Sequence, residues 1–309
     1  IENNIPYVIT LHDAWWLCGR QFMIDKHGKF CGQYTIDSRV CATCVSNPSF
    51  NNERMAKMQS ALSHASVLLA PSRYFADFFI ANGYASNRVR VNKNGIRKPV
   101  AAPKMAHAGP VRFGYVGGNT KIKGVHLIKK AFAELDHQDA ELIIVDNAMN
   151  LGFSTYEPTT FKNINRVELV PAYTQNTIDS FFASIDVLLF PAQWKESFGL
   201  TVREALARNF WVISTDAGGA VEDIIPGENG TIIPFTDTGE GLKQAVLDAI
   251  SVFKKYQPGD EITLETSQLT YFEDQADELA NILMGIGKGL YSSNERIIET
   301  TEYRHVDPS

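Results

Sequence analysis

Two glutamates, Glu196 and Glu204, stand eight residues apart around a Phe-Gly step in the stretch WKESFGLTVREALA. The apolar run before this stretch predicts a strand, and the run after it predicts a helix that begins near Phe198 and Gly199. We therefore expect Glu196 in the loop over the strand end and Glu204 one to two turns into the helix. Because a carboxylate only accepts hydrogen bonds, two of them in one place suit a ligand rich in hydroxyls, such as a sugar or a ribose.

Glycines follow three of the predicted strands, where an open parallel sheet binds its ligands. Gly117 and Gly118 end one strand, and Lys123 and Gly124 are expected to open the next helix. Bare backbone and a lysine at a helix N-terminus suit a phosphate. The motif has neither Walker A nor GxGxxG spacing, so by itself it equally fits a tight turn with a solvated lysine. A further glycine pair at 218–219 favours one crevice over three unrelated turns.

All four cysteines lie in one short segment, as Cys18, Cys31, Cys41 and Cys44. Their spacing, C-x12-C-x9-C-x2-C, in a loop-rich segment with few apolar residues suits a tetrahedral four-thiolate site. We predict structural zinc there, with plain thiols and disulfides left open as alternatives. A catalytic zinc is not expected, because four cysteines leave no open coordination position.

The fold class is predicted from the order of the apolar runs. From about residue 111 short continuous apolar runs alternate with helical patterns, which indicates a parallel sheet covered by helices. The first hundred residues show three strands and two helices, about half of a doubly wound domain. The sequence thus predicts a partial N-terminal Rossmann-like domain over 1–105 with a cysteine-rich insert at 14–50, a second Rossmann-like domain over 106–260, and a helix and tail over 261–309. The Pro- and Ala-rich residues 97–110 are expected to link the two domains.

Composition narrows the class of protein. The 309 residues suffice for two domains, and the net charge of −6 argues against a nucleic-acid partner. No apolar run approaches the roughly 20 residues that span a bilayer, although peripheral membrane contact is left open. The rest of the chain has no cysteine, which suits a reducing compartment, so we predict a cytoplasmic protein. The chain opens at Ile1 without a signal peptide, and we expect that the natural start is not included.

The stretch ESFGLTVREALA resembles the E-x7-E motif of retaining glycosyltransferases of the GT-B fold, above all those of glycosyltransferase family 4. YVGGNTKIKG, DVLLFPAQWKESFGL, EALARNFWVISTDAGGAVEDI and GENGTIIP follow in the order of that family, while LLAPS and VNKNGI resemble the end of its N-terminal domain. The resemblance covers most of residues 5–250. It implies two Rossmann-like domains whose parallel sheets face a central cleft, the N-terminal domain here lacking its start.

The resemblance also assigns roles to residues. Glu196 would contact the donor sugar, Glu204 the ribose of the nucleotide, and Lys123 the diphosphate. His12, in the stretch VITLHDAW, matches the family's histidine at a strand end near the reacting carbon, so the catalytic set would be His12, Glu196 and Lys123. The whole donor-binding set would be Gly117, Gly118, Lys123, Glu196, Ser197, Phe198, Gly199, Leu200 and Glu204. One departure is that Gly118 stands where the family often has an arginine as a second phosphate ligand.

The implied activity is retaining transfer of a sugar from a UDP- or GDP-sugar to a glycan or lipid-linked acceptor. Retention would come from front-face attack, since no glycosidase-type pair of carboxylates is apparent. The leaving diphosphate would help to deprotonate the acceptor hydroxyl. No catalytic metal is expected, because no DxD-like pair accompanies the motifs. A non-catalytic nucleotide-sugar-binding subunit and a GT-B nucleotide-sugar epimerase are the alternatives.

Overall fold

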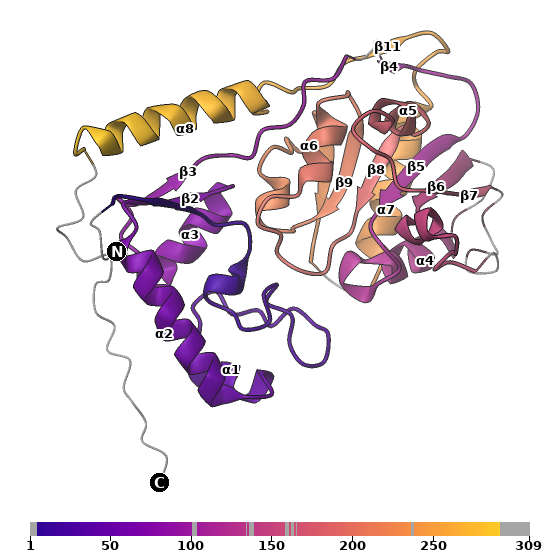
Figure 1. Cartoon of the computed structure of the whole chain (residues 1–309). Coiled ribbons are helices and arrows are strands. Elements are labelled where there is room, and N and C mark those ends of the chain that lie inside the picture. The colour runs from indigo at the N-terminus through magenta and orange to yellow at the C-terminus, as the bar shows by residue number, and fades with distance from the viewer. Residues whose placement is uncertain are drawn as a thin grey trace. The chain divides into compact units, whose positions relative to one another are not determined.

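The computed structural model describes residues 5–290 apart from 101–103, 134, 136–138, 158–160, 162–163, 165 and 236–237. The chain divides into two units (Figure 1). The first comprises residues 1–27, 31–94 and 273–309, and the second comprises 28–30 and 95–272. The division thus falls at 94/95 and 272/273, whereas the sequence patterns place the boundaries at 105/106 and 260/261.

The second unit is built on a six-stranded parallel sheet in the order β10-β9-β8-β5-β6-β7. Its strands are β5 (Val111–Val116), β6 (Ala140–Val145), β7 (Val167–Val170), β8 (Val187–Phe190), β9 (Trp211–Thr215) and β10 (Gly230–Ile233). The chain runs outward from β5 to β7 on one side and from β8 to β10 on the other. The strand order therefore reverses between β5 and β8, the point at which open parallel sheets bind ligands.

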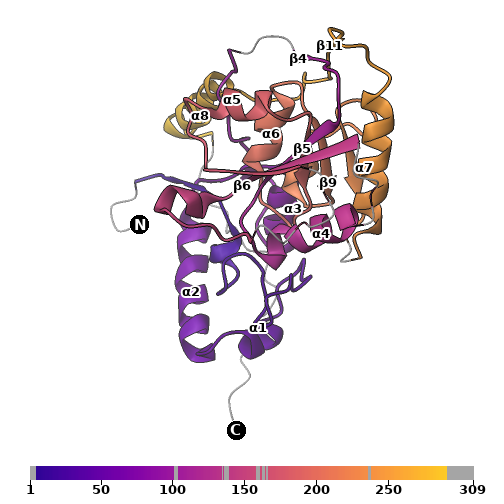
Figure 2. The same ribbon diagram turned by 90° about the vertical axis from the view of Figure 1, so that its right-hand side faces the viewer.

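Helices cover both faces of this sheet, as continuous apolar strands require. They are α4 (Val125–Ala133), α5 (Ile178–Ala183), α6 (Leu200–Leu206) and α7 (Glu240–Phe253). Figure 2 shows α4 and α7 beside the sheet. Their apolar side chains pack in one core with Val187 and Leu189 of β8. Because side chains alternate along a strand, Leu188 and Phe190 point to the opposite face, where Phe182 of α5 lies 5.6 Å from Phe210 between ring centres. The predicted parallel sheet covered by helices is confirmed.

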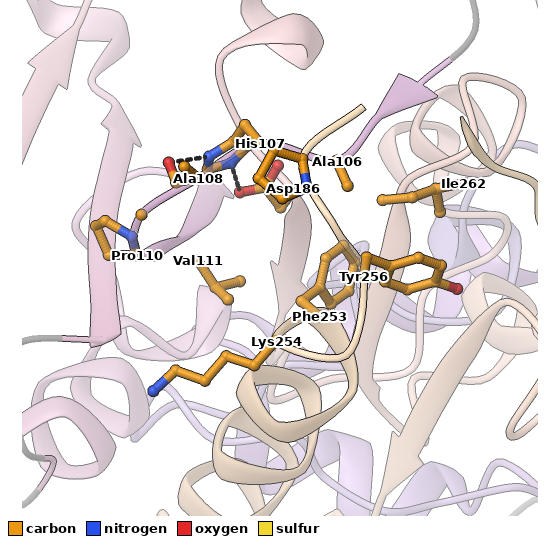
Figure 3. A pocket seen from close by; sticks show the side chains of 12 residues that line it. Ala106, His107, Ala108, Pro110, Val111, Asp186, Phe253, Lys254, Tyr256 and Ile262 are labelled. Carbon is orange, nitrogen blue, oxygen red and sulfur yellow. Dashed lines mark hydrogen bonds and ion pairs between the residues drawn. The ribbon is translucent and has the colours of Figure 1, made fainter. Parts of the chain in front are cut away.

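The chain enters the second unit through a buried charge cluster at the amino ends of β5 and β8. Lys104 Nζ and His107 Nε2 each lie 2.8 Å from a carboxylate oxygen of Asp186, and Arg112 Nη2 lies 2.9 Å away. Burial by itself would raise the pKa of Asp186, but the hydrogen bonds from Arg112 and the charge of Lys104 hold it far below its usual range. His107 bonds to Asp186 (Figure 3), and both side chains line a cavity of about 220 Å³.

Part of the predicted linker is itself a strand. β4 (Lys104–Met105) pairs antiparallel with β11 (Glu261–Ile262). The segment that precedes the six strands of the large sheet in the sequence thus pairs with the segment that follows them. The sequence patterns did not predict β4, β10 or β11, each of which is at most four residues long. β4 and β11 have two residues each, too few for a period to be recognised.

The first unit holds a three-stranded parallel sheet in the order β1-β2-β3, with the strands and helices that the sequence predicts. Its elements are β1 (Val8–Thr10), β2 (Val67–Ala70), β3 (Val89–Val91), α1 (Ser38–Cys44), α2 (Pro48–His64) and α3 (Arg73–Ala81). The helix α1 lies in the cysteine-rich segment that was expected to be loop-rich. A last helix, α8 (Phe272–Gly287), packs Ile282 against Val67 and Leu69 of β2. Within the described part of the chain, no helix has the length and apolar character needed to cross a membrane.

A glycine fixes how closely the loops after β5 and β8 approach each other. Lys123 ends a 3-10 turn, η2 (Lys121–Lys123), rather than opening α4 as expected, and Gly124 follows with φ +80°. A Cβ placed on Gly124 would lie 1.8 Å from the carbonyl oxygen of Pro191, directly after β8. Only glycine combines the left-handed backbone with this close contact.

We predict that Gly124→Ala destabilises the protein by at least about 2 kcal/mol, because it adds left-handed strain and a clash with the Pro191 backbone. Denaturant unfolding measures the change. Gly118→Ala is the control from the same loop, since no described atom lies within 4 Å of the Cβ it would add; its effect should stay within about 0.5 kcal/mol. Equal losses in the two variants would contradict this role of Gly124.

Candidate active site

The candidate site lies where the loops after β5 and β8 meet, at the reversal of strand order. Besides the contact between Gly124 and Pro191, the backbone N–H of Gln193 donates to the carbonyl of Ile122 over 2.7 Å. These contacts join residues 117–124 to residues 191–199. The two segments that the sequence singles out as phosphate-binding and sugar-binding are therefore neighbours in the fold.

Lys123 and Glu196 form an ion pair at this junction. Lys123 Nζ lies 2.9 Å from Glu196 Oε1, although 73 residues separate the two in sequence. Trp194 Nε1 donates to the same oxygen over 2.6 Å, and its ring lies 4.8 Å below the lysine ammonium. Among the described residues none donates to Glu196 Oε2. The Lys123 side chain is 35% exposed and that of Glu196 14%, so the pair is reachable by a ligand.

Tyr115 shapes the glycine turn beneath this pair. Its hydroxyl lies 3.1 Å from the carbonyl oxygens of Gly117 and Gly118 and 3.2 Å from that of Lys123. Burial raises the pKa of Tyr115, so the hydroxyl remains a donor at neutral pH. A Cβ on Gly117 would lie 2.8 Å from the tyrosine oxygen, so packing requires this glycine.

The glycine pair at 218–219 fastens the backbone of Glu196. The N–H of Glu196 donates to the carbonyl of Ala217, and the N–H of Gly219 donates to the carbonyl of Glu196, both over 2.9 Å. The glycine segment after β9 is thus joined to the loop after β8. Gly199, with φ +79°, lets the start of α6 approach Ala220, since a Cβ there would lie 2.5 Å from that of Ala220. Packing against protein therefore already accounts for Gly199. Of the predicted donor-binding residues nearby, Phe198 is buried, Ser197 half-buried and Leu200 exposed.

Glu204 lies in α6, as predicted, and is largely buried. Tyr173 donates its hydroxyl to Glu204 Oε2 over 3.3 Å. Burial raises the pKa of Glu204, while the charge of Arg208 and the bond from Tyr173 partly oppose that rise. Tyr115, Tyr173 and Trp194 were not predicted as site residues. Tyr115 lies within an apolar run, and Tyr173 and Trp194 lie in loops. In neither setting does the local sequence indicate which distant group the polar atom will bind.

His12 belongs to the first unit, two residues after the end of β1, and is exposed. Its neighbour Asp13 has a structural task, because its carboxylate caps the 3-10 turn η1 (Ala14–Trp16) by accepting from the N–H of Trp15 over 2.8 Å. Asp13 also accepts from Gln21 Nε2 over 2.6 Å. The predicted role of His12 stays a prediction.

The four cysteines are free thiols, so the disulfide alternative has no support in the structure. In the described ranges no group of three or more His, Cys, Asp or Glu side chains is arranged to hold a metal ion, which leaves the predicted zinc at Cys18, Cys31, Cys41 and Cys44 without structural support. Polar contacts fasten the segment instead. Arg54 of α2 donates to the carbonyl of Trp15, and Asn82 after α3 accepts from the N–H of Ile36 over 2.8 Å.

We predict that Glu204→Gln raises the melting temperature at neutral pH. Because the folded pKa of Glu204 lies above its ordinary value of 4.5, the folded state holds the proton more tightly than the unfolded state does. The stability cost of the carboxylate is then absent below the ordinary pKa and appears as pH rises through the folded pKa. Glutamine keeps the contact with Tyr173 without that cost. Thermal melts at about pH 4 and about pH 7.5 measure the difference.

The variant and the natural chain should melt alike at the acidic pH and diverge at the neutral one. Glu228→Gln, a change of an exposed glutamate, serves as the control and should shift neither melt. A lower melting temperature for Glu204→Gln at neutral pH would show that the carboxylate stabilises the fold.

Comparisons with known proteins agree with this geometry. A family model described as "Glycosyl transferases group 1" matches residues 102–257, most of the second unit. An uncharacterized glycosyltransferase of Methanocaldococcus jannaschii is 25% identical over 192 residues, 62% of this chain and 51% of the relative. The lipopolysaccharide core biosynthesis mannosyltransferase LpcC of Rhizobium leguminosarum is 29% identical over 138 residues, 42% of this chain and 38% of the relative. The chain spans about half, or less, of the length of these relatives.

Among solved structures, that of HepE of Anabaena in complex with UDP-glucose is similar, with a TM-score of 0.63 at 18% identity. The likeness covers 91% of this chain and 72% of that chain. At this identity it bears on the fold alone, and it confirms the predicted GT-B class of two Rossmann-like domains.

Proposed function

The chain belongs to the group 1 glycosyl transferases, and from this premise we propose that it transfers a sugar, with retention of configuration, from a UDP-sugar to a hydroxyl of a glycan or lipid-linked saccharide. The ion pair between Lys123 and Glu196 at the reversal of strand order carries the proposal. The UDP-glucose complex of HepE supports UDP as the nucleotide, and the activity in the name of LpcC supports a glycan acceptor. We place the enzyme in family 4 on the E-x7-E motif of residues 196–204.

The pair has the chemistry that a nucleotide-sugar site needs. A diphosphate competes with Glu196 for the ammonium of Lys123, because charge-assisted bonds to phosphate are strong. Once Lys123 turns to the phosphate, Glu196 accepts from hydroxyls of the sugar while Trp194 still holds its Oε1. Lys123 then stabilises the charge that develops on the departing diphosphate. Glu204 accepts from the ribose, and the proposal keeps for His12 the role at the reacting carbon that the family resemblance implies.

The remaining parts of the proposal follow from the same premise. Retention proceeds by front-face attack, with the leaving diphosphate accepting the proton of the acceptor hydroxyl. The proposal needs no catalytic metal, since Lys123 supplies the charge. A cytoplasmic location is part of it, and the four free thiols suit a reducing compartment.

Calorimetric titration of UDP, UDP-glucose and GDP-mannose into the natural chain and two variants tests this function. Lys123→Ala should weaken UDP binding about 10- to 100-fold, since a hydrogen bond to a charged group contributes about 1.5–3 kcal/mol. Glu196→Gln should leave UDP binding intact or tighten it, because Lys123 loses its competing partner. Release of UDP from the donor should nevertheless fall by about 100-fold in that variant, equal to about 2.7 kcal/mol.

Lys129→Ala is the matched control. Lys129 of α4 lies over the ring of Phe161 and does not belong to the loops after β5 and β8 that form the candidate site. It should bind UDP as the natural chain does. Failure of the natural chain to bind any of the three nucleotides would contradict the function, and binding of GDP-mannose alone would contradict the proposed base. Donor binding without any turnover would favour the non-catalytic binding subunit.

A further inference from the structure

We propose that Arg203, together with Asp223, is a positioning residue that fixes Glu196 and the loops after β8 and β9 for the donor sugar. The role rests on the function proposed above, but the contacts that carry it are independent of any ligand. Arg203 directly precedes Glu204 in α6, and yet it is among the most deeply buried side chains, with 1% of its surface exposed. A group so enclosed cannot touch a ligand itself, so its effect on the donor must pass through other residues.

The guanidinium of Arg203 bonds to three acceptors, one in the loop after β8 and two in the segment after β9. Its Nε donates to Asp223 Oδ2 over 2.7 Å, in the turn that follows the 3-10 helix η6 (Gly219–Val221). Its Nη2 donates to the carbonyl of Gly219 over 2.7 Å, and its Nη1 donates to the carbonyl of Phe198. The guanidinium carbon also lies 4.1 Å from the centre of the Phe198 ring.

These bonds enclose Glu196. Gly219 accepts from Arg203 through its carbonyl and donates through its N–H to the carbonyl of Glu196. Phe198, two residues beyond Glu196, is held from the other side by the same guanidinium. The backbone of Glu196 is thus fixed at both ends, and its carboxylate is set where Lys123 and Trp194 meet it.

Only arginine can make this set of contacts. Its planar fork of five N–H donors reaches several acceptors at fixed angles, whereas lysine offers one compact charge on a flexible stem. A buried ion pair contributes little net stability, because desolvation of both charges offsets their attraction, and apolar pairs of similar volume often serve equally well. The pair of Arg203 and Asp223 is therefore better explained by the geometry that it imposes on the loops than by stability.

The test uses the double variant Arg203→Met/Asp223→Leu, which removes both charges so that no buried carboxylate is stranded. Amide hydrogen exchange is followed at Glu196 and Gly219, whose N–H groups donate to the carbonyls of Ala217 and Glu196. UDP binding and turnover of UDP-glucose are measured on the same protein. We expect exchange at both amides at least tenfold faster, turnover at least tenfold lower, and UDP bound with unchanged stoichiometry and an affinity within threefold.

Two further variants sharpen the test. Arg203→Lys keeps a charge for Asp223 but cannot reach all three acceptors, so its turnover should fall between those of the natural chain and the double variant. Lys104→Met removes one charge from the buried cluster at the opposite end of the same sheet and leaves Asp186 paired with His107 and Arg112. It should leave exchange at Glu196 and Gly219 and turnover unchanged.

The outcomes separate this role from the proposed function. Unchanged exchange at Glu196 and Gly219 in the double variant would overturn the positioning role, whatever the nucleotide. Loss of turnover in proportion to a loss of UDP-binding stoichiometry would also overturn it, since that is the mark of partial unfolding. Failure of the natural chain to bind UDP would overturn the proposed donor, while faster exchange in the variant would still support the hold of Arg203 on the loops.

Discussion

The contact between Gly124 and the carbonyl of Pro191 is the constraint on which the candidate site depends. It sets how closely the loops after β5 and β8 approach where the strand order reverses. Lys123 precedes this glycine, and Glu196 stands five residues after Pro191, so the distance between their charged groups follows from that approach. A side chain at position 124 would separate the loops, and the ion pair could form only after the backbone moved.

The two ends of the large sheet carry different kinds of charge cluster, one buried and one partly exposed. At the amino ends, Asp186 is enclosed by Lys104, His107 and Arg112, which leaves its oxygens engaged and its pKa far below the usual range. That cluster fastens the start of β5. At the carboxyl ends, the pair of Lys123 and Glu196 is partly exposed, so a ligand can replace one partner. In a binding site a charged group must be able to leave its protein partner for the ligand at a small cost in free energy. In a buried structural cluster every charged group must keep its partners, because an unpaired buried charge is strongly destabilising.

Rigid loops carry the candidate chemistry. Tyr115 supports the glycine turn after β5, Trp194 holds one oxygen of Glu196, and Arg203 closes the loops after β8 and β9. None of these three side chains needs to react. They act by limiting the conformations that the loops adopt without ligand, which lowers the entropy lost when a ligand binds. Glu204 differs from these three side chains, because burial of its carboxylate lowers the stability of the fold. Active sites often retain such groups at a cost in stability.

The sequence by itself determined the elements and the residue types of the site. Continuous apolar runs predicted the parallel sheets, and the spacing of Glu196 and Glu204 placed one in a loop and the other in a helix, as the structure has them. These features depend on neighbours within a few residues, which a pattern records. The tertiary structure decided which distant groups meet. It paired Glu196 with Lys123, turned Arg203 inward from a short helix, joined α8 to the first unit and held the cysteine segment through Arg54 and Asn82. Strand order and packing bring such residues together, and no local spacing encodes them.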